Sequence, residues 1–342
     1  MISTANGTIL VTGGAGFLGS HVVDSLIELG NRVVVLDDLS GGSPDNINPD
    51  ARFIQGSILD HHLVDWIFAE HAIRYVYHFA AYAAEGLSNF IKRFNYHNNL
   101  IGSINLLNSS IKYDVQCFVF TSSIAVYGAN KLPMAEDLVP APEDSYGIAK
   151  LALEQELNIS QKMFGLNYVI YRPHNLYGER QNIGDPYRNV IGIFMNQIMK
   201  GESLTIFGDG RQTRAFTYVK DVAPVIAQTH LTPRAYGHTF NIGADKYYDL
   251  NSLAKAVANA MGTTPQIIYL EARKEVLDAY SSHDKVRAFF DSPAETSLED
   301  GLDRMAAWAK VVGPRAGSPF SEIEVEKKLP PSWRRLFLSS SL

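Results

Sequence analysis

The chain has 342 residues, of which 46% are hydrophobic and 19% are charged, and its formal net charge is −6. This length accommodates one large α/β unit with an appended lobe, or two domains, and the composition can fill a sizeable core. Nucleic acids and acidic membranes bind concentrated Lys and Arg, so the acidic balance argues against both as partners and leaves a phosphate-bearing small molecule open.

The first elements predict a dinucleotide-binding turn. The apolar run Thr8 to Thr12 predicts a strand, and the periodicity of Ser20 to Leu29 predicts a helix. Between them stand Gly13, Gly16 and Gly19, in the spacing of the dinucleotide fingerprint. Gly13 permits the tight turn, Gly16 lets the backbone approach a pyrophosphate, and Gly19 lets helix and strand pack closely. The amides at the helix start then bind the phosphates.

A second predicted strand, Arg32 to Leu36, ends in Asp37 and Asp38. A carboxylate at that strand end accepts both ribose hydroxyls and repels a 2′-phosphate, so the sequence favours NAD over NADP. Asp37 is the stronger candidate because it comes first after the strand. Asp38 has the alternative of a solvated turn residue.

Strands and helices continue to alternate along the first half of the chain. Strands are expected at 52–56, 75–81 and 115–123, and helices at 61–70 and 90–112. This alternation predicts an α/β fold with a doubly wound parallel sheet of the Rossmann type, whose ligands lie beyond the carboxyl ends of the strands. The glycine turn, Asp37 and the pair Ser122 and Ser123 all fall at that edge.

Tyr146 and Lys150 stand four residues apart in a segment with helical periodicity, so their side chains are neighbours on one helix face. An ordinary Tyr has a pKa of about 10, roughly three units too high for a base at neutral pH. A cation about 6 Å away lowers that pKa by roughly two units, and an oxidised nicotinamide is one candidate for a second positive charge. The spacing indicates a proton-transferring Tyr beside a nicotinamide, with a Ser hydroxyl holding the substrate oxygen. The alternative is an ordinary amphipathic helix.

The pattern changes after residue 185. We expect an NAD-binding domain over 1–185 with returning segments at roughly 215–245, and mainly a substrate-binding lobe with a C-terminal tail over 186–342. The lobe is expected to be smaller, of mixed α/β structure and partly interleaved with the first domain. The stretch Ser332 to Phe337 is expected to be a docked tail.

These motifs resemble those of the extended short-chain dehydrogenase/reductases, specifically the NAD-dependent nucleotide-sugar epimerase/dehydratase branch. The resemblance covers most of the chain. The stretches that carry it are the glycine turn, Asp37, Thr121 to Gly128, Tyr146-x-x-x-Lys150, Tyr171 to Gly178, Ile206 to Asp221 and Arg273 to Tyr280.

The resemblance implies a role for each matching residue. It implies that NAD is held by Gly13, Gly16, Phe17, Leu18, Gly19, Asp37, Asp38, Ser57, Ile58, Phe79, Ala80, Ala81, Asn98, Tyr146, Lys150 and His174. It implies that the substrate is bound by Ser123, Tyr146, Asn175, Arg180, Arg214, Arg273 and Tyr280. Ser123, Tyr146 and Lys150 are the implied catalytic residues. The paired guanidinium groups of Arg214 and Arg273 suit a nucleotide diphosphate, since each can form a bidentate fork.

Some positions depart from the family pattern. Ser57 stands where an acidic residue is usual, and Ala83 stands where galactose epimerases carry Lys. The dehydratases carry an Asp-Glu pair just after the strand Ser or Thr, and here the corresponding residues are Ser123, Ile124 and Ala125. Because removal of water needs that additional acid and base, the sequence argues against dehydration. The implied reaction is 4-epimerisation of a nucleotide sugar through a 4-keto intermediate with bound NAD.

The sugar is less well determined. The resemblance is greatest to enzymes acting on UDP-glucose and UDP-galactose, and the bulk of Tyr280 suggests hexoses without an N-acetyl group. UDP-glucuronate is the competitor, because Arg180 lies close to the expected sugar site and could face a carboxylate. Uronate epimerases tend to carry Thr where Asn175 stands, which favours the neutral hexoses. Two further alternatives are a reductase with net redox and a non-catalytic dinucleotide-binding protein.

The remaining features predict no further chemistry. Cys117 lies in an apolar run and reads as a core residue, and the His residues show no metal-ligand spacing. No signal peptide or membrane-spanning run is evident, so we expect a cytoplasmic location. The resemblance implies a homodimer built on the helices at 90–112 and 145–164.

Overall fold

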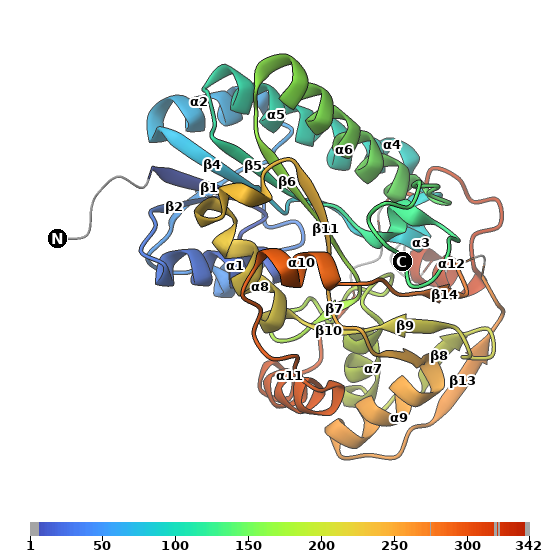
Figure 1. The fold of residues 1–342 in the computed structure, drawn as a ribbon. Coiled ribbons are helices and arrows are strands. Elements are labelled where there is room, and N and C mark those ends of the chain that lie inside the picture. Colours follow the sequence, from blue (N-terminus) through green and yellow to red (C-terminus); the bar gives the residue numbers. More distant parts are fainter. Residues whose placement is uncertain (1–6, 274, 318–319, 321, 339–342) are drawn as a thin grey trace.

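A computed structural model describes residues 7–273, 275–317, 320 and 322–338 (Figure 1). A seven-stranded sheet in the order β11-β6-β5-β4-β1-β2-β3 forms its centre, and every neighbouring pair is parallel. The strands are β1 (Thr8–Thr12), β2 (Val33–Asp37), β3 (Arg52–Gln55), β4 (Ile73–His78), β5 (Cys117–Thr121), β6 (Tyr168–Pro173) and β11 (His238–Ile242). The predicted doubly wound fold is confirmed.

Helices cover both faces of this sheet, which explains why β1 and β2 are buried along their whole length and apolar in their central residues. One face packs against α1 (Phe17–Glu28) and α8 (Val219–Ala227). The opposite face packs against α2 (His61–His71), α5 (Gly102–Lys112) and α6 (Ser145–Phe164), as Figure 1 shows. The two cores fix the carboxyl ends of the strands along one edge.

The predicted helix over 90–112 is wrong in its continuity. The chain forms the short helices α3 (Glu85–Ser88) and α4 (Lys92–Tyr96), then a π-helical turn, His97–Ile101, and only then α5. Within the π-turn, the buried Asn99 side chain donates to Tyr82 O at 3.0 Å and accepts from Tyr82 N at 2.8 Å. It thereby ties the widened turn to the loop after β4, at the site edge.

The second lobe contains α7, α9 and α11 around a separate apolar core. Its elements are α7 (Val190–Met199), β8 (Leu204–Phe207), β9 (Thr213–Ala215), β12 (Tyr247–Asp249), α9 (Leu250–Met261), β13 (Ile267–Leu270), β14 (Asp278–Ala279) and α11 (Leu298–Val312). The segment 215–245 returns to the large sheet as α8 and β11. The remaining elements are β7 (Leu176–Tyr177), β10 (Thr217–Tyr218), α10 (Asp284–Phe289), α12 (Pro331–Leu338) and short 3-10 turns at 44–46, 124–127, 228–231 and 233–235.

The lobe lies beyond the carboxyl edge of the large sheet, and the C-terminal α12 lies close to α3 at the same end of the molecule (Figure 1). Three parts of the chain therefore meet there: the sheet edge, the lobe and the tail. None of the described helices is both long and apolar enough to cross a membrane.

Candidate active site

A cavity of ≈1420 Å³ lies where these parts meet. Its wall includes residues from the first glycine turn, from the ends of β4, β5 and β6, from the lobe and from the tail. Among the residues predicted for the site, those that line it are Phe17, Leu18, Phe79, Ala81, Ser123, Tyr146, Lys150, His174, Asn175, Arg214 and Arg273. The strand ends thus bring together residues more than 250 positions apart in the chain.

The glycine turn has no room for side chains. A Cβ at Gly13, where φ is +72°, would lie 2.6 Å from Ala80 N, and a Cβ at Gly19 would lie 2.1 Å from Gly13 O. Ala80 is thereby a packing partner of the turn. Gly16 is the residue before α1. The first amides of that helix are therefore those of Phe17 and Leu18, which line the cavity. This backbone cradle fits a pyrophosphate.

Asp37 fits a ribose. It is 8% exposed, and its carboxylate accepts Ala15 N at 3.0 Å and Leu39 N at 2.8 Å. Burial is the main reason that its pKa lies above the ordinary value. The two backbone bonds orient the carboxylate and leave lone pairs for ribose hydroxyls. Asp38 is exposed and accepts Ser40 N at 2.9 Å, as a turn residue does.

Three further residues implied for NAD do not line the cavity: Ser57, Ile58 and Asn98. Ser57 Oγ accepts Leu59 N at 3.3 Å in a local turn, and Ile58 is 5% exposed in the core. Asn98 donates to Asn99 Oδ1 at 3.1 Å. Their contacts with the cofactor stay a prediction.

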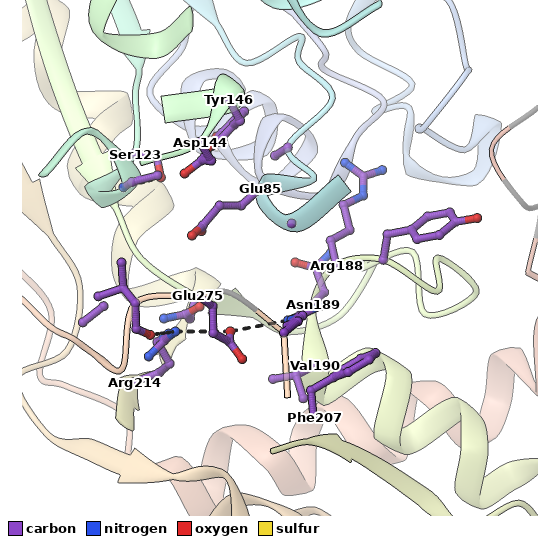
Figure 2. A pocket seen from close by; sticks show the side chains of 18 of the residues that line it. Glu85, Ser123, Asp144, Tyr146, Arg188, Asn189, Val190, Phe207, Arg214 and Glu275 are labelled. Atoms are coloured by element: carbon purple, nitrogen blue, oxygen red, sulfur yellow. Dashed lines mark hydrogen bonds and ion pairs between the residues drawn. The ribbon is translucent and has the colours of Figure 1, made fainter. Parts of the chain in front are cut away.

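Tyr146 lies in the first turn of α6, which Asp144 caps by accepting Gly147 N at 2.8 Å. Its side chain is 7% exposed and lines the cavity beside Ser123, which follows β5 (Figure 2). Burial raises the pKa of Tyr146 well above its ordinary value, and a hydrogen bond with the Ser123 side chain is the largest influence that lowers it. Burial outweighs the lowering influences in the chain alone, and a lowering of this pKa by Lys150 together with an oxidised nicotinamide stays a prediction.

Lys150 is 3% exposed and lies one turn after Tyr146, with Nζ 5.6 Å from the centre of the Tyr146 ring. Its ammonium donates to Thr121 O at 2.8 Å. Burial lowers the pKa of Lys150 to about 7, and the carboxylate of Glu154 opposes that shift. Lys150 is thus held at the end of β5, beside Tyr146.

Glu154 belongs to a buried ion pair behind the site. Arg172, on β6, donates from Nε to Glu154 Oε1 at 3.0 Å and from Nη2 to Oε2, and each side chain is 6% exposed. Ser122 Oγ also donates to Oε1. Both candidate serines line the cavity. The Ser122 hydroxyl is used to brace α6 against the sheet, whereas the Ser123 side chain hydrogen-bonds with Tyr146.

The two predicted diphosphate ligands converge on a carboxylate that the sequence analysis missed. Glu275 lies 3.4 Å from Arg214 Nη2 and 3.5 Å from Arg273 Nη2. Arg214 also donates to the backbone oxygens of Thr213, Val276 and Leu277. The buried Nε of Arg273 has no hydrogen-bond partner among the described residues. Arg273 is consequently the better placed of the two to take a ligand anion.

Asn175 and His174 follow β6 at the cavity wall. Asn175 has φ of +40° and donates to Ala215 O at 3.0 Å. His174 is 2% exposed, and its ring nitrogens lie 3.2 Å from Ala215 O and 2.9 Å from His283 Nε2. Burial lowers the pKa of His174 to about 3, so it is neutral at physiological pH.

Glu85 is a second carboxylate that the sequence analysis missed. It lies between Ser123 and Tyr146 on one side and Arg214 and Glu275 on the other, as Figure 2 shows. Its side chain is exposed to the space of the cavity but lies deep between the surrounding elements. Removal from bulk water, with Asp144 next in importance, raises its pKa to about 7. No described residue forms a hydrogen bond or ion pair with its carboxyl group. Its place shortly after β4, at the edge where ligands bind, was the available signal.

Arg180 is not a cavity residue, so the expectation that it faces a sugar carboxylate is wrong. Its Nη1 lies 2.7 Å from Asp24 Oδ2 on α1. The backbone at Arg180 has φ of +67°.

Tyr280 is also misassigned. Its ring stacks on Tyr247 with centroids 4.3 Å apart, and it does not line the cavity, whereas the preceding Ala279 does. Consecutive residues of an extended strand point to opposite sides, so a shift of one position exchanges a large side chain for a small one. The bulk of Tyr280 consequently gives no evidence against an N-acetyl group on the sugar.

The described residues contain no cluster of three or more His, Cys, Asp or Glu side chains that could hold a metal ion. Cys117 is buried in the core, as predicted, and burial raises the pKa of its thiol.

Comparison with known proteins gives a consistent result. The model of the NAD dependent epimerase/dehydratase family matches residues 9–243. A putative UDP-glucose 4-epimerase of Methanocaldococcus jannaschii is 38% identical over 309 residues, which cover 88% of this chain and 98% of that protein.

Two solved structures have the same fold over nearly their whole length. The UDP-glucose 4-epimerase of Thermotoga maritima, determined with UDP-glucose, has a TM-score of 0.83 at 36% identity and covers 89% of this chain and 99% of its own. The UDP-glucuronic acid 4-epimerase of Bacillus cereus, in complex with UDP-glucuronic acid and NAD, has a TM-score of 0.82 at 28% identity. The match covers 89% of this chain and 99% of that one. This chain belongs to the NAD-dependent epimerase/dehydratase family.

Proposed function

We propose that this protein is a UDP-sugar 4-epimerase that interconverts UDP-glucose and UDP-galactose with bound NAD. One observation carries the proposal: Tyr146 and Ser123 lie at one end of a cavity that Lys150 also lines beside Tyr146, and Glu275, which pairs with Arg273, lies across the cavity from them (Figure 2). A sugar whose diphosphate lies at Arg273 can present a hydroxyl to Tyr146. The UDP-glucose 4-epimerases among the relatives support the choice of reaction.

Each catalytic group has a distinct task. Tyr146 Oη removes the proton of the sugar 4-hydroxyl as a hydride leaves the sugar C4. It returns a proton to the same oxygen when the 4-keto group is reduced. Ser123 Oγ holds the same sugar oxygen by a hydrogen bond. Lys150 places positive charge beside Tyr146, and Glu154 helps to keep that ammonium protonated.

The cradle at Gly13 to Gly19 and the oriented carboxylate of Asp37 fit NAD, which supplies the acceptor that takes the hydride and gives it back. Reversal of configuration then requires only that the 4-keto sugar present its other face. No net redox occurs, so the protein needs no added cofactor to turn over. An NAD-dependent reductase would need a continuous supply of NADH.

Incubation of the purified protein with UDP-glucose, UDP-galactose or UDP-glucuronate, without added cofactor, tests the proposal. We expect UDP-glucose and UDP-galactose to interconvert to a common equilibrium mixture with no change of mass. A product lighter by one water would indicate dehydration, and turnover only with added NADH would indicate the reductase. Either result would replace the proposed function.

Glu85 supports a neutral hexose over a uronate. It lies between the Tyr146 end and the Arg273 end of the cavity, where the pyranose ring must lie if the diphosphate and the 4-hydroxyl are held as proposed. Because the pKa of Glu85 is raised to about 7, its carboxyl group is neutral below that pH and negatively charged above it. A sugar carboxylate meets increasing repulsion as the pH rises, whereas a hydroxymethyl group does not.

This gives a testable pH dependence. We expect the ratio of kcat/KM for UDP-glucose to that for UDP-glucuronate to rise between pH 6 and pH 8.5 in the parent. In Glu85→Gln the ratio should lose this slope, and at pH 8.5 the value for UDP-glucuronate should rise by roughly tenfold relative to the parent. Glu202→Gln, at an exposed position outside the cavity, is the control. Parallel pH profiles for the parent and Glu85→Gln would contradict this role.

We also propose that the protein forms a homodimer through α6, α5 and the π-helical turn that precedes α5. Ile101, Ile148, Ile159, Met163 and Phe164 lie on these helices and are between 45% and 69% exposed, which is unusual for large apolar side chains. Light scattering of the purified protein tests this directly.

A further inference from the structure

The strongest feature outside the predicted site is the C-terminal tail. Residues 325 and 327–333 line the same cavity as Tyr146, and they include Lys327, Lys328 and Trp333. We propose that this tail segment is part of the nucleoside-diphosphate binding site, with the two lysines facing the diphosphate and Trp333 positioning Arg273. The inference rests on the proposed function only for the kind of ligand.

The tail is firmly anchored before it reaches the cavity. Glu324 accepts Arg93 N at 2.8 Å and Phe94 N at 2.9 Å with its two carboxylate oxygens. The backbone amides of Glu324 and Val325 donate to Phe90 O at 2.9 and 3.1 Å. These bonds hold the tail on α4, in the segment that follows Glu85. The position of the lysines is therefore fixed by the fold.

Trp333 is buried at the end of this segment. It is 3% exposed and belongs to an apolar cluster with Leu329, Tyr187 and residues of α3. Its ring makes edge contacts with Phe90, Tyr187 and Phe207 at centroid distances of 6.2, 5.4 and 6.3 Å. Trp333 consequently connects the sheet edge to β8 of the lobe.

Arg273 lies against this tryptophan. Its guanidinium carbon lies 4.6 Å from the centre of the Phe207 ring and 5.8 Å from that of Trp333. A Cβ at Gly86 would lie 3.3 Å from Trp333 Cη2 and 3.5 Å from Arg273 Nη1, so the small residue after Glu85 leaves room for both. The aromatic rings fix the plane of the guanidinium, and its buried Nε lacks a partner among the described residues. Trp333 is therefore a positioning residue for Arg273, the residue predicted to bind the diphosphate.

Lys327 and Lys328 add charge to this end. Both are exposed to solvent and line the cavity, and neither forms an ion pair with any described residue. The carboxylate of Glu275 pairs with Arg214 and Arg273 and with neither lysine. The lysine ammonium groups are thus available to an anion. They also provide the positive charge that the sequence comparison found missing at Ala83.

The test uses the NAD-loaded, full-length protein and UDP as the binding probe. The first variant combines Lys327→Ala with Lys328→Ala, and its control combines Lys162→Ala with Lys255→Ala, two exposed lysines outside the cavity. We expect the tail variant to raise the Kd for UDP and the KM for UDP-glucose by roughly tenfold, with a weaker salt dependence, and the control to leave both unchanged.

Trp333 is tested by Trp333→Ala against Trp333→Phe. Trp333→Ala should raise KM and Kd at nearly unchanged kcat, and Trp333→Phe should restore most of the affinity. The inference is overturned if the lysine variant binds UDP as the parent does, or if Trp333→Ala lowers kcat in step with the folded fraction at constant KM. If the parent binds UDP, and the variants weaken that binding, but no sugar is converted, the proposed function fails while the tail inference stands.

Discussion

Replacement of Tyr146 by Phe is expected to lower kcat for UDP-glucose by about 10²- to 10⁴-fold, because it removes the only proton-transferring group proposed to act on the 4-hydroxyl. The phenyl ring of the variant keeps the packing of a side chain that is 7% exposed. The loss should therefore appear in kcat, with KM and NAD content close to those of the parent. Steady-state kinetics and the absorbance of NAD released on denaturation measure both quantities.

The matched control is Ser123→Ala. It removes the hydroxyl that lowers the pKa of Tyr146 and that is proposed to hold the sugar oxygen, but it leaves the proposed proton-transferring group in place. We expect a smaller loss than for Tyr146→Phe and a pH profile displaced to higher pH, since the Tyr146 pKa rises further. An epimerisation rate in Tyr146→Phe within threefold of the parent would show that another group moves the proton.

The second large effect is on stability. Replacement of Arg172 by Met leaves the Glu154 carboxylate buried without its charged partner, and breaking such a pair costs about 3–5 kcal/mol in unfolding free energy. Ser122 alone still donates to it, and Tyr127 loses the guanidinium that lies 4.7 Å from its ring. Urea unfolding at a fixed NAD concentration measures the change.

The double variant Arg172→Met with Glu154→Met separates the charge from the packing. Replacing both partners of a buried ion pair by apolar residues is often nearly neutral, so the double variant should be more stable than Arg172→Met alone. Its activity should nevertheless fall, because Lys150 loses the carboxylate that keeps its pKa as high as about 7. A double variant less stable than the single one would contradict the account of this pair.

The sequence was most informative where spacing along the chain is itself the signal. Gly13, Gly16 and Gly19 lie within one turn, and Tyr146 and Lys150 lie within one helical turn, so their proximity follows from local geometry. The parallel sheet then brings these local groups to one edge. The helix predicted over 90–112 needed correction at the π-helical turn, where the Asn99 side chain bonds the backbone of the loop after β4.

The errors arise where contacts join distant segments or where one residue of register decides a direction. Tyr280 and Ala279 are neighbours in one motif, and only the strand geometry shows that Ala279 is the one that faces the cavity. Glu275 and Trp333 acquire their importance through Arg273, and no spacing rule connects positions in a lobe and a tail. Arg180 has a partner, Asp24, on the first helix.

The central claim is that one hydride leaves the sugar C4 and returns to it inside the cavity. The direct measurement is turnover of UDP-glucose that carries deuterium at C4, by the purified protein without added cofactor, with the label located in the product by NMR. We predict UDP-galactose that retains the deuterium at C4. Product with protium at that carbon, or no product until NADH is supplied, would contradict the claim.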